Sequence, residues 1–97
     1  MFYLYILHSE TANKYFVSHA ENHAEALLFH NSDNKHKYTG KFDDWKSVAV
    51  FEAGKTKEEA LELEKFINRQ KNIKLLMKLI DPDFIPADKL ASLNRVK

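Results

Sequence analysis

One acidic residue stands out because of where it falls on a predicted helix. Thr56 and Glu59 have the spacing of a capping box, which predicts a helix from that point to about Lys71. At about 100° per residue, Glu64 lies roughly 40° from Ala60, inside the apolar arc of this helix. A carboxylate facing a core is costly unless it is paired, hydrogen-bonded or bound to a metal. Glu64 is therefore a candidate functional acid, and the alternative is a partly exposed glutamate with a lysine or tyrosine partner.

Other familiar chemical patterns are missing. The chain has no cysteine, which excludes a disulfide framework, a thiolate metal site and a cysteine nucleophile. Its two glycines, Gly40 and Gly54, build neither a glycine-rich phosphate loop nor a Gly-x-Ser-x-Gly elbow, so no small-molecule cofactor is implied. No two histidines on one predicted helix have the i, i+4 spacing of a zinc motif. The histidines are His8, His19, His23, His30 and His36.

Hydrophobic patterning predicts the elements that must position these side chains. They are strands over 2–8 and from 15 onward, a helix from 22 to about 30, a strand over 45–52, helices over 56–71 and 73–80, and a short helix after Pro86. The order β-β-α-β-α-α favours an α+β fold, a three-stranded antiparallel sheet with flanking helices. We expect one domain over 1–80. Residues 81–97 would be a C-terminal extension whose short helix, carrying Leu90 and Leu93, packs on that domain.

Composition narrows the class of protein. Ninety-seven residues with 44% hydrophobic content fit one folded domain rather than a disordered tail. The apolar stretch 1–7 is too short to span a bilayer and has no basic residue before it or cleavage-site pattern after it. We therefore expect a cytoplasmic protein without a membrane segment. The net charge of +1 does not by itself indicate a nucleic-acid partner.

The basic residues are nevertheless unevenly distributed. Between residues 65 and 80 the chain has five basic residues and no acidic one. This run is either a phosphate-facing strip or a solvated helix surface with cations near its C-terminal end. Further lysines lie in the polar segment before the third strand. The basic residues of the two segments are Lys65, Arg69, Lys71, Lys74 and Lys78, and Lys35, Lys37 and Lys41.

The first two strands carry a resemblance to a known family. Tyr-Leu-Tyr-Ile-Leu at 3–7, followed by Lys-Tyr-Phe-Val-Ser-His at 14–19, resembles the paired signature of the GIY-YIG nuclease superfamily. The closest style is that of small stand-alone bacterial proteins related to the N-terminal nuclease domain of the bacterial repair excinuclease. Further pieces follow in family order, so the resemblance runs from about residue 3 to 80. They are His-Asn-Ser at 30–32, Tyr-Thr-Gly-Lys at 38–41, Asp-Trp-Lys at 44–46 and the helix start at 56–65.

The resemblance implies roles for three residues. Tyr5 matches the tyrosine of the first motif half, which lines the family's site and takes part in handling protons. Glu64 matches the glutamate that holds one divalent cation, so the implied cofactor is Mg²⁺, bound weakly. His30 matches a histidine often found near the site. Tyr5, His30 and Glu64 are thus the expected catalytic residues, and Glu64 the expected metal ligand.

Three other positions depart from the family pattern. The tyrosine of the second half is Phe16, and the glycine that follows is Ser18. The family arginine should stand four residues before His30, and that position is Ala26. Arg69 is no substitute, because it lies about 140° around the helix from Glu64. In other phosphoryl-transfer systems a positioned arginine is worth roughly 10³–10⁵-fold in rate.

We therefore expect a GIY-YIG-like domain with an incomplete catalytic set, which binds nucleic acid and cleaves phosphodiesters weakly or not at all. DNA or RNA is the expected partner. One alternative is an active Mg²⁺-dependent DNA endonuclease with an atypical site, and another is a non-enzymatic protein-interaction module. The residues expected to bind nucleic acid are Lys35, Lys37, Lys41, Lys65, Arg69, Lys71 and Lys74.

Overall fold

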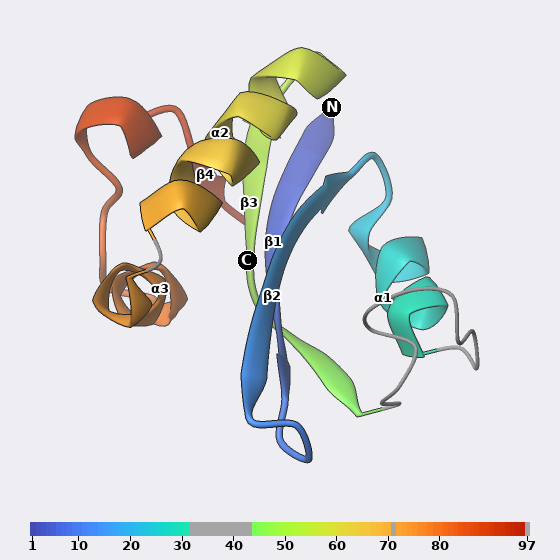
Figure 1. Ribbon diagram of the computed structural model, residues 1–97. Coiled ribbons are helices and arrows are strands. Elements are labelled where there is room, and N and C mark those ends of the chain that lie inside the picture. The colour runs from blue at the N-terminus through green and yellow to red at the C-terminus, as the bar shows by residue number, and fades with distance from the viewer. Residues whose placement is uncertain (32–43, 71, 97) are drawn as a thin grey trace.

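The computed structural model describes residues 1–31, 44–70 and 72–96; for residues 29–31 it describes the backbone alone. Its sheet has the strand order β2-β1-β3-β4, and all three pairs of neighbours are antiparallel. Figure 1 shows α1 on one side of this sheet, with α2 and α3 on the other side. The strands are β1 (Phe2–Ser9), β2 (Lys14–Ala20), β3 (Trp45–Gly54) and β4 (Asn94–Arg95), and the helices are α1 (His23–Asn31), α2 (Lys57–Gln70), α3 (Ile73–Ile80) and the 3-10 turn η2 (Asp88–Leu90).

The expected α+β class, an antiparallel sheet with flanking helices, is confirmed, but the sheet has four strands and not the expected three. The additional strand is β4, whose Arg95 and Asn94 lie opposite Phe51 and Glu52 of β3. Just beyond it, the Val96 amide donates to the Val50 carbonyl oxygen at 2.8 Å. A strand of two residues shows no alternation in the sequence, so hydrophobic patterning could not reveal it.

The segment between α3 and β4 also differs from expectation. The helix predicted after Pro86 is a single 3-10 turn, η2, which ends at Leu90 and leaves Leu93 outside it. Asp88 has a φ of 56°, in the left-handed region, and a right-handed α-helix cannot continue through that conformation. Leu90 and Leu93 are still buried and belong to the main core.

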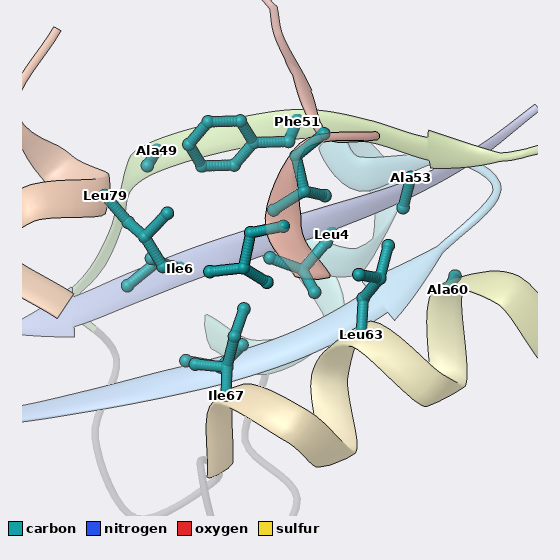
Figure 2. Close-up of a cluster of buried hydrophobic side chains, with 12 residues drawn as sticks. Leu4, Ile6, Ala49, Phe51, Ala53, Ala60, Leu63, Ile67 and Leu79 are labelled. Atoms are coloured by element: carbon teal, nitrogen blue, oxygen red, sulfur yellow. The ribbon is translucent and has the colours of Figure 1, made fainter. Parts of the chain in front are cut away.

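The main core lies between the sheet and α2. On β1 the side chains of Leu4 and Ile6 point to this side, and both are fully buried. Figure 2 shows them meeting Leu63 and Ile67 of α2 beneath Phe51 of β3. A smaller cluster on the other side of the sheet joins β1 to α1. It consists of Tyr5, Leu7 and Trp45, with Phe16, Ala20, Ala26, Leu27 and Val50 packed around them.

Side-chain caps set where the site-bearing helices begin, and the cap predicted at Thr56 is present. The Glu59 amide donates to Thr56 Oγ1 at 3.2 Å, which starts α2 one residue later, at Lys57. The Glu25 amide donates to Asn22 Oδ1 at 3.0 Å before α1. Because these caps fix the first turn of each helix, they also fix which side chains α1 and α2 turn toward the sheet.

The tip of the β1–β2 hairpin is tied to the start of β3. Ser9 Oγ donates to Asp44 Oδ1 at 2.5 Å, and the Thr11 amide donates to Asp44 Oδ2 at 2.9 Å. These two hydrogen bonds lower the pKa of the Asp44 carboxyl to about 2, and the bond from Ser9 has the larger effect. The hairpin therefore keeps its position against β3, although the residues just before Asp44 lie outside the described part of the chain.

Arg95 provides a test of the unexpected fourth strand. Its Nη2 donates to the carbonyl oxygens of Leu79 and Asp81, both at 2.7 Å, and its Cζ lies 4.7 Å from the ring centroid of Phe51. We expect Arg95→Ala to lower the free energy of unfolding by about 1.5–3 kcal/mol, the usual worth of hydrogen bonds to a charged group. Urea denaturation followed by circular dichroism measures this loss.

Two companion variants make the Arg95 test specific. Arg95→Lys keeps the charge but loses the planar fork, so its stability should fall between those of Arg95→Ala and the wild type. Lys55→Ala, at an exposed position outside the strands, should change stability by less than about 0.5 kcal/mol. If Arg95→Ala unfolds like Lys55→Ala, the C-terminal strand does not hold the sheet as described.

Candidate functional site

The hairpin and α1 enclose a depression at the end of β2. Its volume is about 520 Å³, and Tyr5 lies in its wall. Its polar lining comes from β1, from the end of β2, from the turn that follows and from the first turn of α1. The described residues that line it are Tyr5, Ser18, His19, Ala20, Glu21, Asn22, Glu25 and Ala26. None of them is a lysine or arginine, so within the described residues this depression has no permanent cation.

Tyr5 is almost completely buried, with 2% of its surface exposed. It lies opposite Ser18 in the β1–β2 register. Burial raises the pKa of the Tyr5 phenol above 10.0, the hydrogen bond with Ser18 acts in the opposite direction, and the negative charge of Glu64 raises it further. At neutral pH the phenol is therefore protonated. In that state it can donate a hydrogen bond to an oxygen in the depression but cannot accept a proton as a general base.

Glu64 is held by a histidine of the hairpin. Its Oε1 lies 2.8 Å from Nδ1 of His19, and the two side chains are 18% and 15% exposed. The inward orientation predicted from the helical phase of α2 is thus present, and the polar partner that a semi-buried carboxylate requires is an imidazole. His19 lies opposite Leu4, which points toward α2, so the register places His19 on the side of the sheet where Glu64 lies.

The two polar pairs lie on opposite sides of one edge strand. Ser18 and His19 are consecutive in β2, so their side chains point to opposite faces of the sheet. Ser18 therefore joins Tyr5 on the α1 side, whereas His19 joins Glu64 on the α2 side. Glu64 is not among the described residues lining the depression, yet its charge still acts on the Tyr5 phenol. The charge of one pair therefore acts on the phenol of the other pair.

The remaining predicted site residues are not gathered here. His30 lies in the last turn of α1, and its side chain is not described. Lys65 and Arg69 are exposed and line a different groove, and Lys74 of α3 lines the adjoining one. Arg69 Nε donates to the Lys65 carbonyl oxygen at 3.4 Å, so the side chain runs along its own helix. Lys35, Lys37, Lys41 and Lys71 lie outside the described residues.

The sequence analysis assigned no functional role to Ser18, the partner of Tyr5, or to His19, the partner of Glu64. A signal was available for His19. A four-residue turn at 10–13 sets the hairpin register, and alternation from the apolar Val17 then places His19 on the helix-facing side. For Ser18 the only signal was that it lies opposite Tyr5, which also depends on the register.

One family model covers the strands and helices that form this site. The model of the GIY-YIG catalytic domain matches residues 1–77, from β1 into α3. The chain belongs to the GIY-YIG family. Its sheet, hairpin and α2 are those of a nuclease-like GIY-YIG domain, with β4 outside the matched range. No curated protein and no solved structure matches the chain.

Two negative findings apply to the described part of this GIY-YIG domain. No group of three or more histidine, aspartate or glutamate side chains is placed to hold a metal ion together. In the same residues no helix is long and apolar enough to cross a membrane.

The Tyr5 environment predicts a distinctive alkaline titration. Tyr5 should ionise above pH 10.0, because burial disfavours its charged form. Because its pKa is raised in the folded state, the associated stability is complete below pH 10 and is lost as the pH rises through the folded-state pKa. Ultraviolet difference titration of the wild type against Tyr5→Phe measures the Tyr5 pKa directly.

The same titration tests the coupling to Glu64. Glu64→Gln removes the negative charge, so the Tyr5 pKa should fall but stay above 10.0, because burial is the larger cause. Glu62→Gln, on the exposed side of α2, is the matched control and should leave the Tyr5 pKa unchanged. Equal titration of Tyr5 in both variants would show that the charge of Glu64 does not reach the depression.

Proposed function

We propose that this GIY-YIG domain binds nucleic acid and cleaves phosphodiesters weakly or not at all. The observation that carries the proposal is the lining of the depression beside Tyr5. Ala26, which stands where the family resemblance places an arginine, is half-buried in that lining, and the described lining has no lysine or arginine. A phosphoryl group placed there would lack the planar donor that stabilises charge on its oxygens.

The two tyrosine positions support the same view. Tyr5 is protonated at neutral pH and serves best as a hydrogen-bond donor. Phe16, which takes the place of the second tyrosine, packs in the cluster under α1 with its ring centroid 6.3 Å from that of Trp45. It contributes apolar contact and has no hydroxyl to offer the depression. Phe16 thus keeps the aromatic ring that packs in this cluster and lacks the hydroxyl that would contact a substrate.

Glu64 fits one coordination position of Mg²⁺. This ion usually keeps several waters and needs only one or two carboxylates from the protein. The Glu64 carboxylate is partly exposed, and the contact with His19 holds its orientation, as neighbouring hydrogen bonds commonly do for metal ligands. When bound, the ion would supply Lewis-acid stabilisation of a phosphoryl oxygen. With a single protein ligand, we expect its affinity to be low.

A plasmid assay tests the catalytic half of the proposal. The wild type with Mg²⁺ or Mn²⁺ should nick supercoiled DNA slowly or not at all. The double variant Ala26→Arg with Phe16→Tyr restores the two missing groups and should raise the rate at least tenfold, well below the roughly 10³–10⁵-fold of a fully positioned arginine. Adding Glu64→Ala to that variant should remove the gain.

One result would reverse this conclusion in favour of the active endonuclease. If the wild type cleaves the plasmid and Glu64→Ala alone abolishes the cleavage, the site works without a guanidinium. Circular dichroism of each variant separates a loss of activity from a loss of fold.

Salt-dependent binding tests the nucleic-acid half. We expect the wild type to bind labelled oligonucleotides at low micromolar protein and low salt. The logarithm of the binding constant should fall linearly with the logarithm of salt concentration, by about 0.7 per neutralised phosphate of a single strand and about 0.9 for duplex DNA. Fluorescence anisotropy gives the slope. Absence of binding to DNA and RNA at low salt would instead favour the protein-interaction module.

A further inference from the structure

A hollow with a larger volume than the depression beside Tyr5 lies along α2. A groove of about 1000 Å³ runs along α2, and a second hollow of about 540 Å³ adjoins it along α3. Phe66 and Lys89 border both, so together they form one track, here called the α2–α3 groove. Figure 1 shows the segment after α3 turning back beside α2, and this segment supplies the outer wall.

Aromatic side chains lie in the α2–α3 groove. Phe66 and Phe84 line it and are half-buried, each packed on the main core. Above the ring of Phe66, Lys89 Nζ lies 5.4 Å from the centroid, so one aromatic face is turned toward the groove and toward a flexible cationic side chain. An aromatic face of this kind is a platform on which any nucleobase can stack.

Cations outnumber carboxylates in the same groove. The described lining has five basic residues and three acidic ones, Glu59, Glu62 and Asp88. No ion pair between described residues involves any of the five cations, so their charge is free to act on a ligand. The five are Lys65, Arg69 and Lys89 beside α2, and Lys74 and Lys78 on α3.

The charges are also ordered along the groove. Glu59 and Glu62 lie in the first half of α2, whereas Lys65 and Arg69 follow toward its C-terminal end. Lys74 and Lys78 continue the cationic stretch on α3. An anionic chain would thus be attracted to the part of the groove around Phe66 and Phe84 and repelled from the beginning of α2. Cations and rings are interleaved in the same stretch.

We propose that the α2–α3 groove binds single-stranded nucleic acid, with phosphates on its cations and a base stacked on Phe66 in place of Lys89. This inference rests on the nucleic-acid binding proposed above and assigns it to a surface separate from the Tyr5–Glu64 site. A duplex keeps its bases stacked on one another, so it cannot use a half-buried ring. An acidic peptide would use the cations without needing the ring.

The test compares groove variants with a control on the same helix. Phe66→Leu keeps apolar contact with the core and removes the stacking face, and the affinity for a labelled single strand should fall about 5- to 150-fold. Lys65→Gln with Arg69→Gln should lower the salt slope by about 1.4, the share of two phosphates. Lys57→Gln, in the first turn of α2 outside the groove, should leave both quantities unchanged.

The probes are an oligothymidylate, an oligouridylate, a duplex of equal length and polyglutamate, each followed by fluorescence anisotropy at several salt concentrations. The two single strands separate DNA from RNA as the source of the ligand. Wild-type affinity should be higher for a single strand than for the duplex, and Phe66→Leu should reduce only the single-strand affinity. Circular dichroism confirms that each variant remains folded.

The outcomes separate this inference from the proposed function. If the wild type binds nucleic acid but Phe66→Leu and the double variant behave like Lys57→Gln, the groove assignment is wrong and the binding function stands. If no oligonucleotide binds, both are wrong. Polyglutamate binding as tight as that of the single strands, and insensitive to Phe66→Leu, would identify an acidic-protein surface instead.

Discussion

The central strand β1 is buried on both of its faces, and the rest of the molecule depends on this constraint. Leu4, Tyr5, Ile6 and Leu7 are each exposed by no more than 2%. Two of them pack toward α2 and two toward α1, so the strand cannot slip by one residue without exchanging the two sets. The position of Tyr5 is therefore fixed by Leu4 and Ile6, which have no part in chemistry themselves.

This constraint divides the site between two faces. The register that buries Leu4 and Ile6 also determines that Ser18 and His19 of β2 point in opposite directions. Each then finds a different partner, a phenol under α1 and a carboxylate on α2. The two pairs are still not independent, because the negative charge of Glu64 raises the pKa of the Tyr5 phenol.

The distribution of charge separates two surfaces of the domain. The depression beside Tyr5 has no described lysine or arginine, whereas the α2–α3 groove has five cations and two aromatic rings. A net charge of +1 hides this contrast, because carboxylates elsewhere offset the cations of the groove. The affinity of a small domain for a polyanion is set by such local clustering rather than by its total charge. The proposed nucleic-acid binding and the proposed loss of cleavage therefore rest on different surfaces of this chain.

The sequence by itself determined the elements from β1 to α3, the α+β class and the inward position of Glu64. Those features follow from local rules: the period of the apolar residues, the capping residues Thr56 and Asn22, and the phase of α2. The family resemblance found in the hairpin agrees with the matched domain over residues 1–77. Only the tertiary structure decided which residues meet. The His19–Glu64 pair joins positions 45 residues apart, and Arg95 of β4 contacts the end of α3 and the face of Phe51. Such contacts depend on how the chain closes over long distances, and no local periodicity records that closure.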